Sequence, residues 1–283
     1  MNAQEVKLAA RQFGADLVGI ADLKTLAYLP ARENPYSIFP QATNVIVIGR
    51  KIPRGSLRGI EQGREMDNSF PQFGFYALED NLLAKTTYDL TIWFEARGYE
   101  AVPLFAYDCD GQEVGVPVAP GKPAPNVMLK YRIMAQAAGL GETALNGLFL
   151  TPEFGPRQRF AMLLTDAGLE SDPPFQPHIC NDCGKCVQAC PLHALNPQDA
   201  QPAGLAGYER PQAARNNILC RRCQNGAVLT NYGRFETVER TAAACSRACI
   251  QALEERGACQ EKFTHRFRQS ATWQRDINGQ SSK

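Results

Sequence analysis

The first half of the chain alternates between helix-like and strand-like patterns of apolar residues. Residues 2–13 repeat apolar side chains at spacings of three and four, which predicts an amphipathic helix that ends at Gly14. The continuous apolar runs 17–20 and 45–48 predict buried strands, and the second is as rich in β-branched residues as a central strand. The segment 30–40, which holds three prolines, predicts a surface loop between them.

The longest predicted helix covers residues 75–97 and closes at Gly98. Its apolar stripe, by default a core-facing one, consists of Phe75, Leu78, Leu82, Leu83, Leu90, Trp93 and Phe94. Shorter patterns predict a strand at 101–105, a helix at 129–138, and strands at 149–150 and 160–164. This mixture of helices and strands predicts an α+β fold.

After residue 173 cysteines replace the apolar periodicity. Cys180, Cys183, Cys186 and Cys190-Pro191 follow the spacing C-x2-C-x2-C-x3-C-P, which is typical of ferredoxins that hold two iron–sulfur clusters. Four further cysteines follow at Cys220, Cys223, Cys245 and Cys249. Eight thiolates are the number that two [4Fe-4S] clusters need.

The last cysteine of each half crosses to the other cluster in such ferredoxins. The predicted first set is therefore Cys180, Cys183, Cys186 and Cys249. The predicted second set is Cys190, Cys220, Cys223 and Cys245. The second set is less compact, since 21 residues separate Cys223 from Cys245. Residues 237–256 predict a helix that carries its last two cysteines four positions apart on one face.

Zinc and disulfides are the alternatives for these cysteines. Zinc sites use two cysteine pairs, whereas three cysteines within seven residues followed by Cys-Pro suit a cubane cluster. A disulfide scaffold is typical of exported proteins, and the sequence shows no secretory signal. Cys109, beside Asp108 and Asp110, and Cys259 stay outside the eight and are interpreted as spare thiols. His178 and His193 flank the first cysteine run. A separate hypothesis is that their side chains form hydrogen bonds to the cluster.

Composition sets the remaining limits. The 283 residues suggest about two domains, with boundaries predicted at 1–172, 173–260 and a polar, basic tail at 261–283 that we expect to be solvated. Lys and Arg number 30 against 29 Asp and Glu, which makes a nucleic-acid-binding surface unlikely. No apolar run is long enough to cross a membrane. Reduced cysteines without an export signal predict a cytoplasmic protein.

A turn before the last predicted strand contains a candidate anion site. Pro152, Gly155 and Pro156 shape the turn, and Arg157 and Arg159 follow it. Arginine offers paired donors to an anionic group. The alternative is a tight hairpin with solvated arginines.

Several of these motifs resemble one protein family. Gly139-Leu140-Gly141, the run 146–155, Leu164-Thr165-Asp166 and the Cys180 run are similar to the shared block of epoxyqueuosine reductases, to which reductive dehalogenases are related. The resemblance implies a nitroreductase-like domain that binds cobalamin, followed by a ferredoxin-like domain with two [4Fe-4S] clusters. It implies cofactor contacts at Gly139, Gly141, Asn146 and Gly147, and we add Arg157 to them.

The departures from the family are equally specific. Glu142-Thr143-Ala144-Leu145 stands where the tRNA-modifying enzymes have Trp-Ile-Gly-Lys. The family's acidic proton donor has no counterpart in the run 123–128, and neither do the C-terminal repeats that help to grip tRNA. A reductase built on this chain needs another acid, for which Asp108, Asp110 and Tyr131 are the candidates.

Three functions follow as hypotheses. The first is a cytoplasmic iron–sulfur oxidoreductase, with or without cobalamin, that takes electrons from a ferredoxin or flavodoxin and reduces a small molecule. The second is an electron-transfer or reactivation protein for a corrinoid or metalloenzyme partner. The third is a divergent tRNA epoxyqueuosine reductase.

Overall fold

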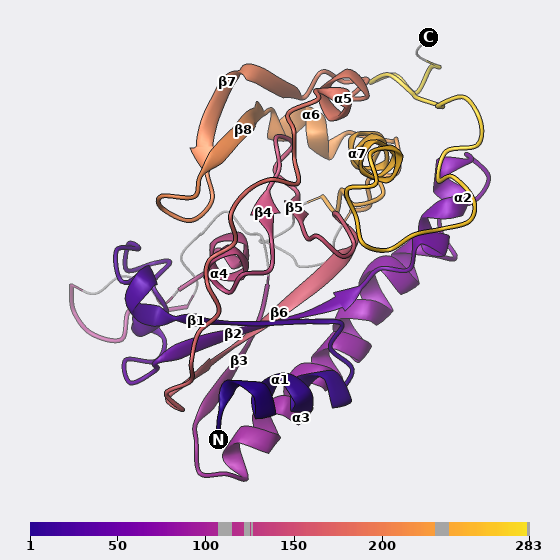
Figure 1. Ribbon diagram of the computed structural model, residues 1–283. Helices are drawn as coiled ribbons and strands as arrows, with labels where there is room; N and C mark the ends of the chain where they lie inside the picture. The colour runs from indigo at the N-terminus through magenta and orange to yellow at the C-terminus, as the bar shows by residue number, and fades with distance from the viewer. Residues whose placement is uncertain (107–114, 122–124, 126, 230–237, 282–283) are drawn as a thin grey trace.

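An antiparallel sheet of four strands organises the first half of the protein (Figure 1). The computed structural model describes residues 1–106, 115–121, 125, 127–229 and 238–281. The strands lie in the order β1-β2-β6-β3. Their bounds are Leu17–Asp22 for β1, Asn44–Lys51 for β2, Ala101–Phe105 for β3 and Gln158–Thr165 for β6. The run 45–48 is therefore an internal strand, as its composition predicts, with Val47 paired to Gly19 and Met162.

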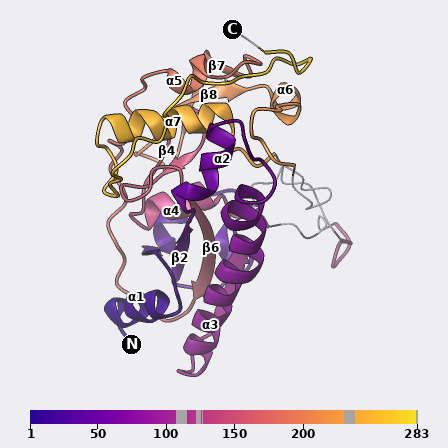
Figure 2. The ribbon, with the colours of Figure 1, turned by 90° about the vertical axis from the view of Figure 1, so that its right-hand side faces the viewer.

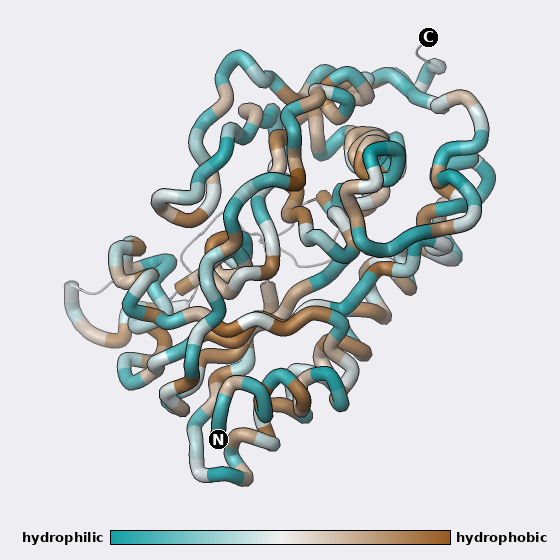
Figure 3. Tube along the Cα trace, viewed as in Figure 1, coloured by the Kyte–Doolittle hydropathy of each residue, from teal (hydrophilic) through white to brown (hydrophobic). Residues whose placement is uncertain are grey.

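Each face of the sheet packs against helices, because successive side chains of a strand point to opposite faces. Ile46 and Ile48 face helices α1, Ala3–Gln12, and α3, Ala84–Glu95. Val45 and Val47 face the other side, where helix α4, Tyr131–Ala137, packs. Figure 2 shows α3 running along the sheet, and Figure 3 shows apolar residues concentrated on the strands. The mixed α/β fold that the sequence predicts is thus confirmed.

The ends of the helices follow local rules. Asn2 caps α1 through a capping box with Glu5, and Gly14 adopts a φ of 105° after its end. The predicted long helix 75–97 begins differently, because two π-helical segments, Phe70–Tyr76 and Leu78–Leu83, precede α3. Gly98 follows α3 with a φ of 80°, as its position predicts.

The cysteine-rich region gathers at one end of the molecule, above the sheet in Figures 1 and 2. Its elements are α5, Lys185–Gln188, the hairpin of β7, Leu195–Ala203, and β8, Arg210–Arg215, then α6, Asn217–Arg221, and α7, Ala244–Glu255. The short strands β4, Glu142–Thr143, and β5, Phe149–Leu150, connect this region to the sheet. The predicted helix at 237–256 begins later than expected, because Glu239 forms a strand-like bridge with Val228 instead.

The C-terminal segment packs against the protein, contrary to the expectation of a solvated tail. Phe267 is 1% exposed, and Trp273 donates its Nε1–H to the carbonyl of Ile60 at 2.7 Å. Arg268 forms an ion pair with the buried Glu61. Two aromatic side chains within a polar run thus anchor it. Among the described residues, no helix has the length and apolar character needed to cross a bilayer.

Candidate iron–sulfur site

The first predicted set of cysteines surrounds a hollow. Cys180 and Cys183 come from the loop that leads into α5, Cys186 lies in α5 itself, and Cys249 comes from α7, which packs on α5. The hollow encloses about 360 Å³ of empty space, part of it open to solvent. Apolar side chains complete its wall, namely Ala144, Leu145, Leu150, Ala252 and Leu253. The structure thus brings Cys249 to three cysteines more than sixty positions earlier in the chain.

Left-handed backbone turns shape the loop. Asp182 has a φ of 54° and Gly184 a φ of 69°, directly before α5. Glycine adopts this conformation without steric cost, and aspartate tolerates it better than most residues. The two reversals place three cysteines within seven residues around one space.

Burial raises the pKa of the Cys249 thiol well above its ordinary value, and the charges of Cys186, Cys180 and Cys183 add to this. Burial likewise raises the pKa of Cys186 to about 12, with contributions from Cys245 and Cys180. Iron binding needs thiolates, so loading the site displaces protons.

The second set, Cys190, Cys220, Cys223 and Cys245, is adjacent. Burial raises the pKa of Cys245, and charges of Cys190 and Cys223 act on it in the same direction. Burial is also the main cause of the raised pKa of Cys223, to which Cys220 and Cys190 contribute. The assignment of the eight cysteines to two sets of four stays a prediction. Since Cys186 and Cys245 influence each other, the groups are neighbours.

The donors around the cysteines fit iron–sulfur clusters. Burial raises the pKa of Cys180, the backbone N–H groups of Leu145 and Asp182 act on this pKa in the opposite direction, and Ala194 N–H donates to Cys190 Sγ at 3.3 Å. Such bonds tune the potential of a cluster. Among the described residues, no three His, Cys, Asp or Glu side chains stand close enough to hold a single metal ion. A four-iron cluster holds its thiolates farther apart than one zinc ion does, because irons and sulfides lie between them.

Glu142 fixes the start of the cysteine loop, a role that the sequence patterns did not reveal. Its side chain is fully buried, and its carboxylate accepts the backbone N–H groups of His178, Ile179 and Cys180 at 2.5, 3.1 and 2.6 Å. Arg210 from β8 lies 4.0 Å away. A glutamate beside Gly141 in an otherwise apolar run was the available signal, because buried carboxylates need such donors.

The glycines that the resemblance assigns to a cofactor are needed by the chain's own backbone. A Cβ on Gly141 would lie 1.9 Å from the carbonyl oxygen of Leu150, and one on Gly139 would lie 2.8 Å from that of Pro173. Gly147 has a φ of 77° and lies against Gln212. The lack of a side chain at these three positions is therefore explained by the packing and backbone conformation of the chain itself, and the cofactor contacts stay a prediction.

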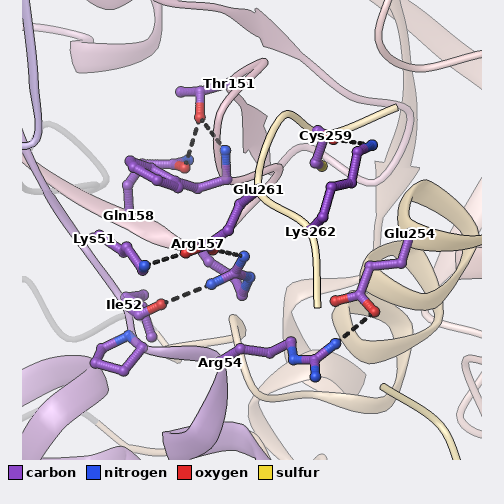
Figure 4. Close-up of polar contacts among 12 residues, drawn as sticks. Lys51, Ile52, Arg54, Thr151, Arg157, Gln158, Glu254, Cys259, Glu261 and Lys262 are labelled. Atoms are coloured by element: carbon purple, nitrogen blue, oxygen red, sulfur yellow. Dashed lines mark hydrogen bonds and ion pairs between the residues drawn. The ribbon is translucent and has the colours of Figure 1, made fainter. Parts of the chain in front are cut away.

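Arg157 is also engaged within the protein (Figure 4). The buried guanidinium donates to the Ile52 carbonyl at 3.1 Å and pairs with Glu261 at 2.5 Å. Lys51 pairs with the same carboxylate. Arg159 is less deeply buried and pairs with Glu239 at 2.5 Å. These arginines are neither solvated nor directed at an external anion, because carboxylates from distant parts of the chain neutralise them.

The other candidate residues lie apart from the cysteines. Tyr131 begins α4 and packs on Phe160, with ring centroids 5.9 Å apart. Asp108, Cys109 and Asp110 lie outside the described residues, so the proton donor stays a prediction. The His178 ring stacks on Phe175, and its Nδ1 contacts the carbonyl of Gln176. His193 stands in a left-handed turn after Cys190. Cys259 is buried beside Gly155, outside both sets.

Known proteins share parts of this sequence. No family model matches the chain. Tetrachloroethene reductive dehalogenase of Desulfitobacterium hafniense is 31% identical over 161 residues, which are 53% of this chain and 26% of that protein. The enzyme of the same name from Sulfurospirillum multivorans is 28% identical over 67% of this chain and 40% of its own length. Epoxyqueuosine reductase of Bacillus subtilis is 40% identical over 67 residues, or 24% of this chain and 17% of that protein.

The fold is shared as well. A catabolic reductive dehalogenase, solved in complex with 3-bromo-4-hydroxybenzoic acid, superposes on 88% of this chain and 31% of its own, with a TM-score of 0.54 and 18% identity. The chain spans about a quarter of the length of the first dehalogenases that it matches. Together with the motif at 139–155 and the cysteine run, the sequence similarities support a relationship of this chain to the epoxyqueuosine reductases and reductive dehalogenases.

Proposed function

We propose that this protein is an iron–sulfur oxidoreductase that passes low-potential electrons through two [4Fe-4S] clusters. The hollow lined by Cys180, Cys183, Cys186 and Cys249 carries this proposal, because four thiols from two elements converge on one apolar space. The clusters would supply one-electron transfer. The chain's residues hold the thiolates, donate N–H bonds to them and shield them from water. Residues 173–260 act as the ferredoxin-like part and residues 1–172 as the nitroreductase-like part.

An iron count tests the proposal directly. Anaerobically reconstituted protein should contain about eight iron and eight sulfide per chain, and Cys183→Ala should lower both to about four. Electron paramagnetic resonance of the reduced protein should show two interacting clusters. A preparation with four iron and one zinc would show that the second set is misassigned.

Two forms of this function are possible, and they differ in the molecule that receives the electrons. In the first, the N-terminal part holds a small-molecule substrate, with or without cobalamin. In the second, the protein delivers electrons to a partner corrinoid or metalloprotein. The packing of Gly139, Gly141 and Gly147 against the chain's own atoms is compatible with both forms.

Cobalamin binding decides between these forms. In the delivery form, adding cobalamin or flavin mononucleotide leaves the visible spectrum and the melting temperature of cluster-loaded protein unchanged, since no ligand stabilises the fold. A raised melting temperature with either compound would establish the first form. A ferredoxin or flavodoxin is the proposed donor, and the balanced charge predicts no binding of a tRNA stem loop.

A further inference from the structure

One buried amide beside the first hollow has an unused donor. Asn146 stands in the turn between β4 and β5 and is 2% exposed. Its Oδ1 accepts the N–H of Leu148 at 3.1 Å, whereas its Nδ2 has no hydrogen-bond partner among the described residues. A buried donor without a partner destabilises the folded protein, because it has lost its hydrogen bonds to water. A polar group in this state requires an explanation.

The turn around Asn146 is held rigidly. Ala144 N–H donates to Leu148 O, and Gly147 N–H donates to Ala144 O, both at 2.8 Å. Ala213 N–H from β8 donates to Leu145 O at 2.8 Å, and buried Arg240 donates to Asn146 O at 3.4 Å. Since Leu148 requires an acceptor from the amide, the Oδ1 faces Leu148 and the Nδ2 faces away from it.

Asn146 is itself part of the wall of the hollow that Cys180, Cys183, Cys186 and Cys249 line. We propose that Asn146 Nδ2 donates a hydrogen bond to a sulfur of the cluster in this hollow and thereby raises its reduction potential. The inference rests on the proposed function. Reduction makes the sulfurs more negative, so a donor stabilises the reduced form more than the oxidised form. This bond supplies the partner that the buried Nδ2 otherwise lacks.

The neighbouring Leu145 sharpens the comparison. Burial raises the pKa of Cys180 and the backbone N–H of Leu145 acts on it in the opposite direction, so the same turn already favours negative charge on this sulfur. A backbone donor cannot be removed by substitution, but the Asn146 amide can. The first cluster would then lose one donor while its ligands stay in place.

Potentials of the two clusters, measured in one molecule, test the inference. In Asn146→Leu the equilibrium constant for reducing the first cluster should fall about tenfold, or 59 mV, while the second cluster is unchanged. Asn146→Asp keeps the acceptor for the Leu148 N–H and should also lower the potential of the first cluster. This variant replaces Asn146→Leu in the test if the leucine variant folds poorly. Gln212→Leu removes an amide that contacts the same turn at Gly147 but does not line the hollow, and it should shift neither cluster.

A spectroscopic readout separates a direct bond from a structural effect. With nitrogen-15 asparagine, pulsed electron paramagnetic resonance of the reduced first cluster should show a coupling that both Asn146 variants lose. Iron-loaded variants with an unchanged first potential, equal shifts in both clusters, or a wild type without the coupling would contradict the inference alone. Wild-type protein that binds no iron would overturn the proposed function and the inference with it.

Discussion

The sheet and the cysteine-rich region are stabilised in different ways. Large aliphatic and aromatic side chains fill the core on both faces of the sheet, and Ile46, Ile48 and Phe94 are fully buried there. The buried core of the cysteine-rich region instead consists of three alanines, three leucines and three of the cysteines. Small side chains bury little apolar area, so the second region depends on whatever its thiols bind.

Buried ion pairs join the two regions. Arg247 of α7 is fully buried and pairs with Glu61 of helix α2, Arg58–Glu61, at 2.7 Å. Arg159 of β6 pairs with Glu239, which precedes α7. Such pairs are costly to break because the remaining charge stays buried. The regions differ in their cores but share this boundary.

The largest expected effect comes from removing one cysteine of the first set. Cys249→Ala should lower the iron content from about eight to about four per chain, because the proposed first cluster loses a ligand. Hydrogen exchange should then accelerate in the loop 180–186 and α7 but not in the sheet, since cluster binding contributes folding free energy. Cys259→Ala is the matched control, a buried cysteine outside both sets that should keep all iron. Equal iron loss in both variants would contradict the assignment.

A smaller effect should follow at the boundary. Burial alone raises the pKa of Glu239, but the charge and hydrogen bond of Arg159 bring this pKa below its ordinary value. Glu239→Gln should therefore cost about 3–5 kcal/mol of unfolding free energy at neutral pH. A lowered folded-state pKa means that this stabilisation is present above the unfolded pKa and is lost as pH falls below it.

Denaturant unfolding at neutral pH and at a pH below the ordinary glutamate pKa of about 4.3 measures this difference. The penalty of Glu239→Gln should shrink at the lower pH, because the unfolded wild type takes up a proton there, whereas folded Glu239, whose pKa is lowered, takes it up only at a still lower pH. Glu255→Gln removes the exposed pair with Lys185 and should cost at most about 1 kcal/mol. A penalty for Glu239→Gln that does not change with pH would show that its charge is unimportant.

The smallest effect should come from the sheet core. Ile46→Val removes one methylene from a fully buried position and should cost about 0.5–1.5 kcal/mol. Iron content should not change, because the sheet buries its apolar area without the cysteines. Ile218→Val, at a side chain that is 75% exposed, should have no measurable effect on unfolding. Iron loss in Ile46→Val would contradict the independence of the two cores.

The spacing of apolar residues predicted those helices and strands that are determined by residues close together in the chain. Continuous apolar runs predicted β1, β2 and β6, whose two faces are both buried, and the spacing of three and four predicted α1, which buries one face. The start of α7 was misplaced, since the bridge between Val228 and Glu239 competes with helix over that stretch. The apolar stripe of residues 75–97 did not predict the two π-helical segments that precede α3.

By itself the sequence determined the cysteine spacing, the family motifs and the strands, because these depend on residues close together in the chain. Only the tertiary structure decided which thiols share a hollow, and that Glu142 and Asn146 lie beside them. It also turned Arg157 inward to Glu261, a residue that was expected to be solvated. A buried charge or amide selects partners by proximity in space, and that proximity exists only once the chain is folded.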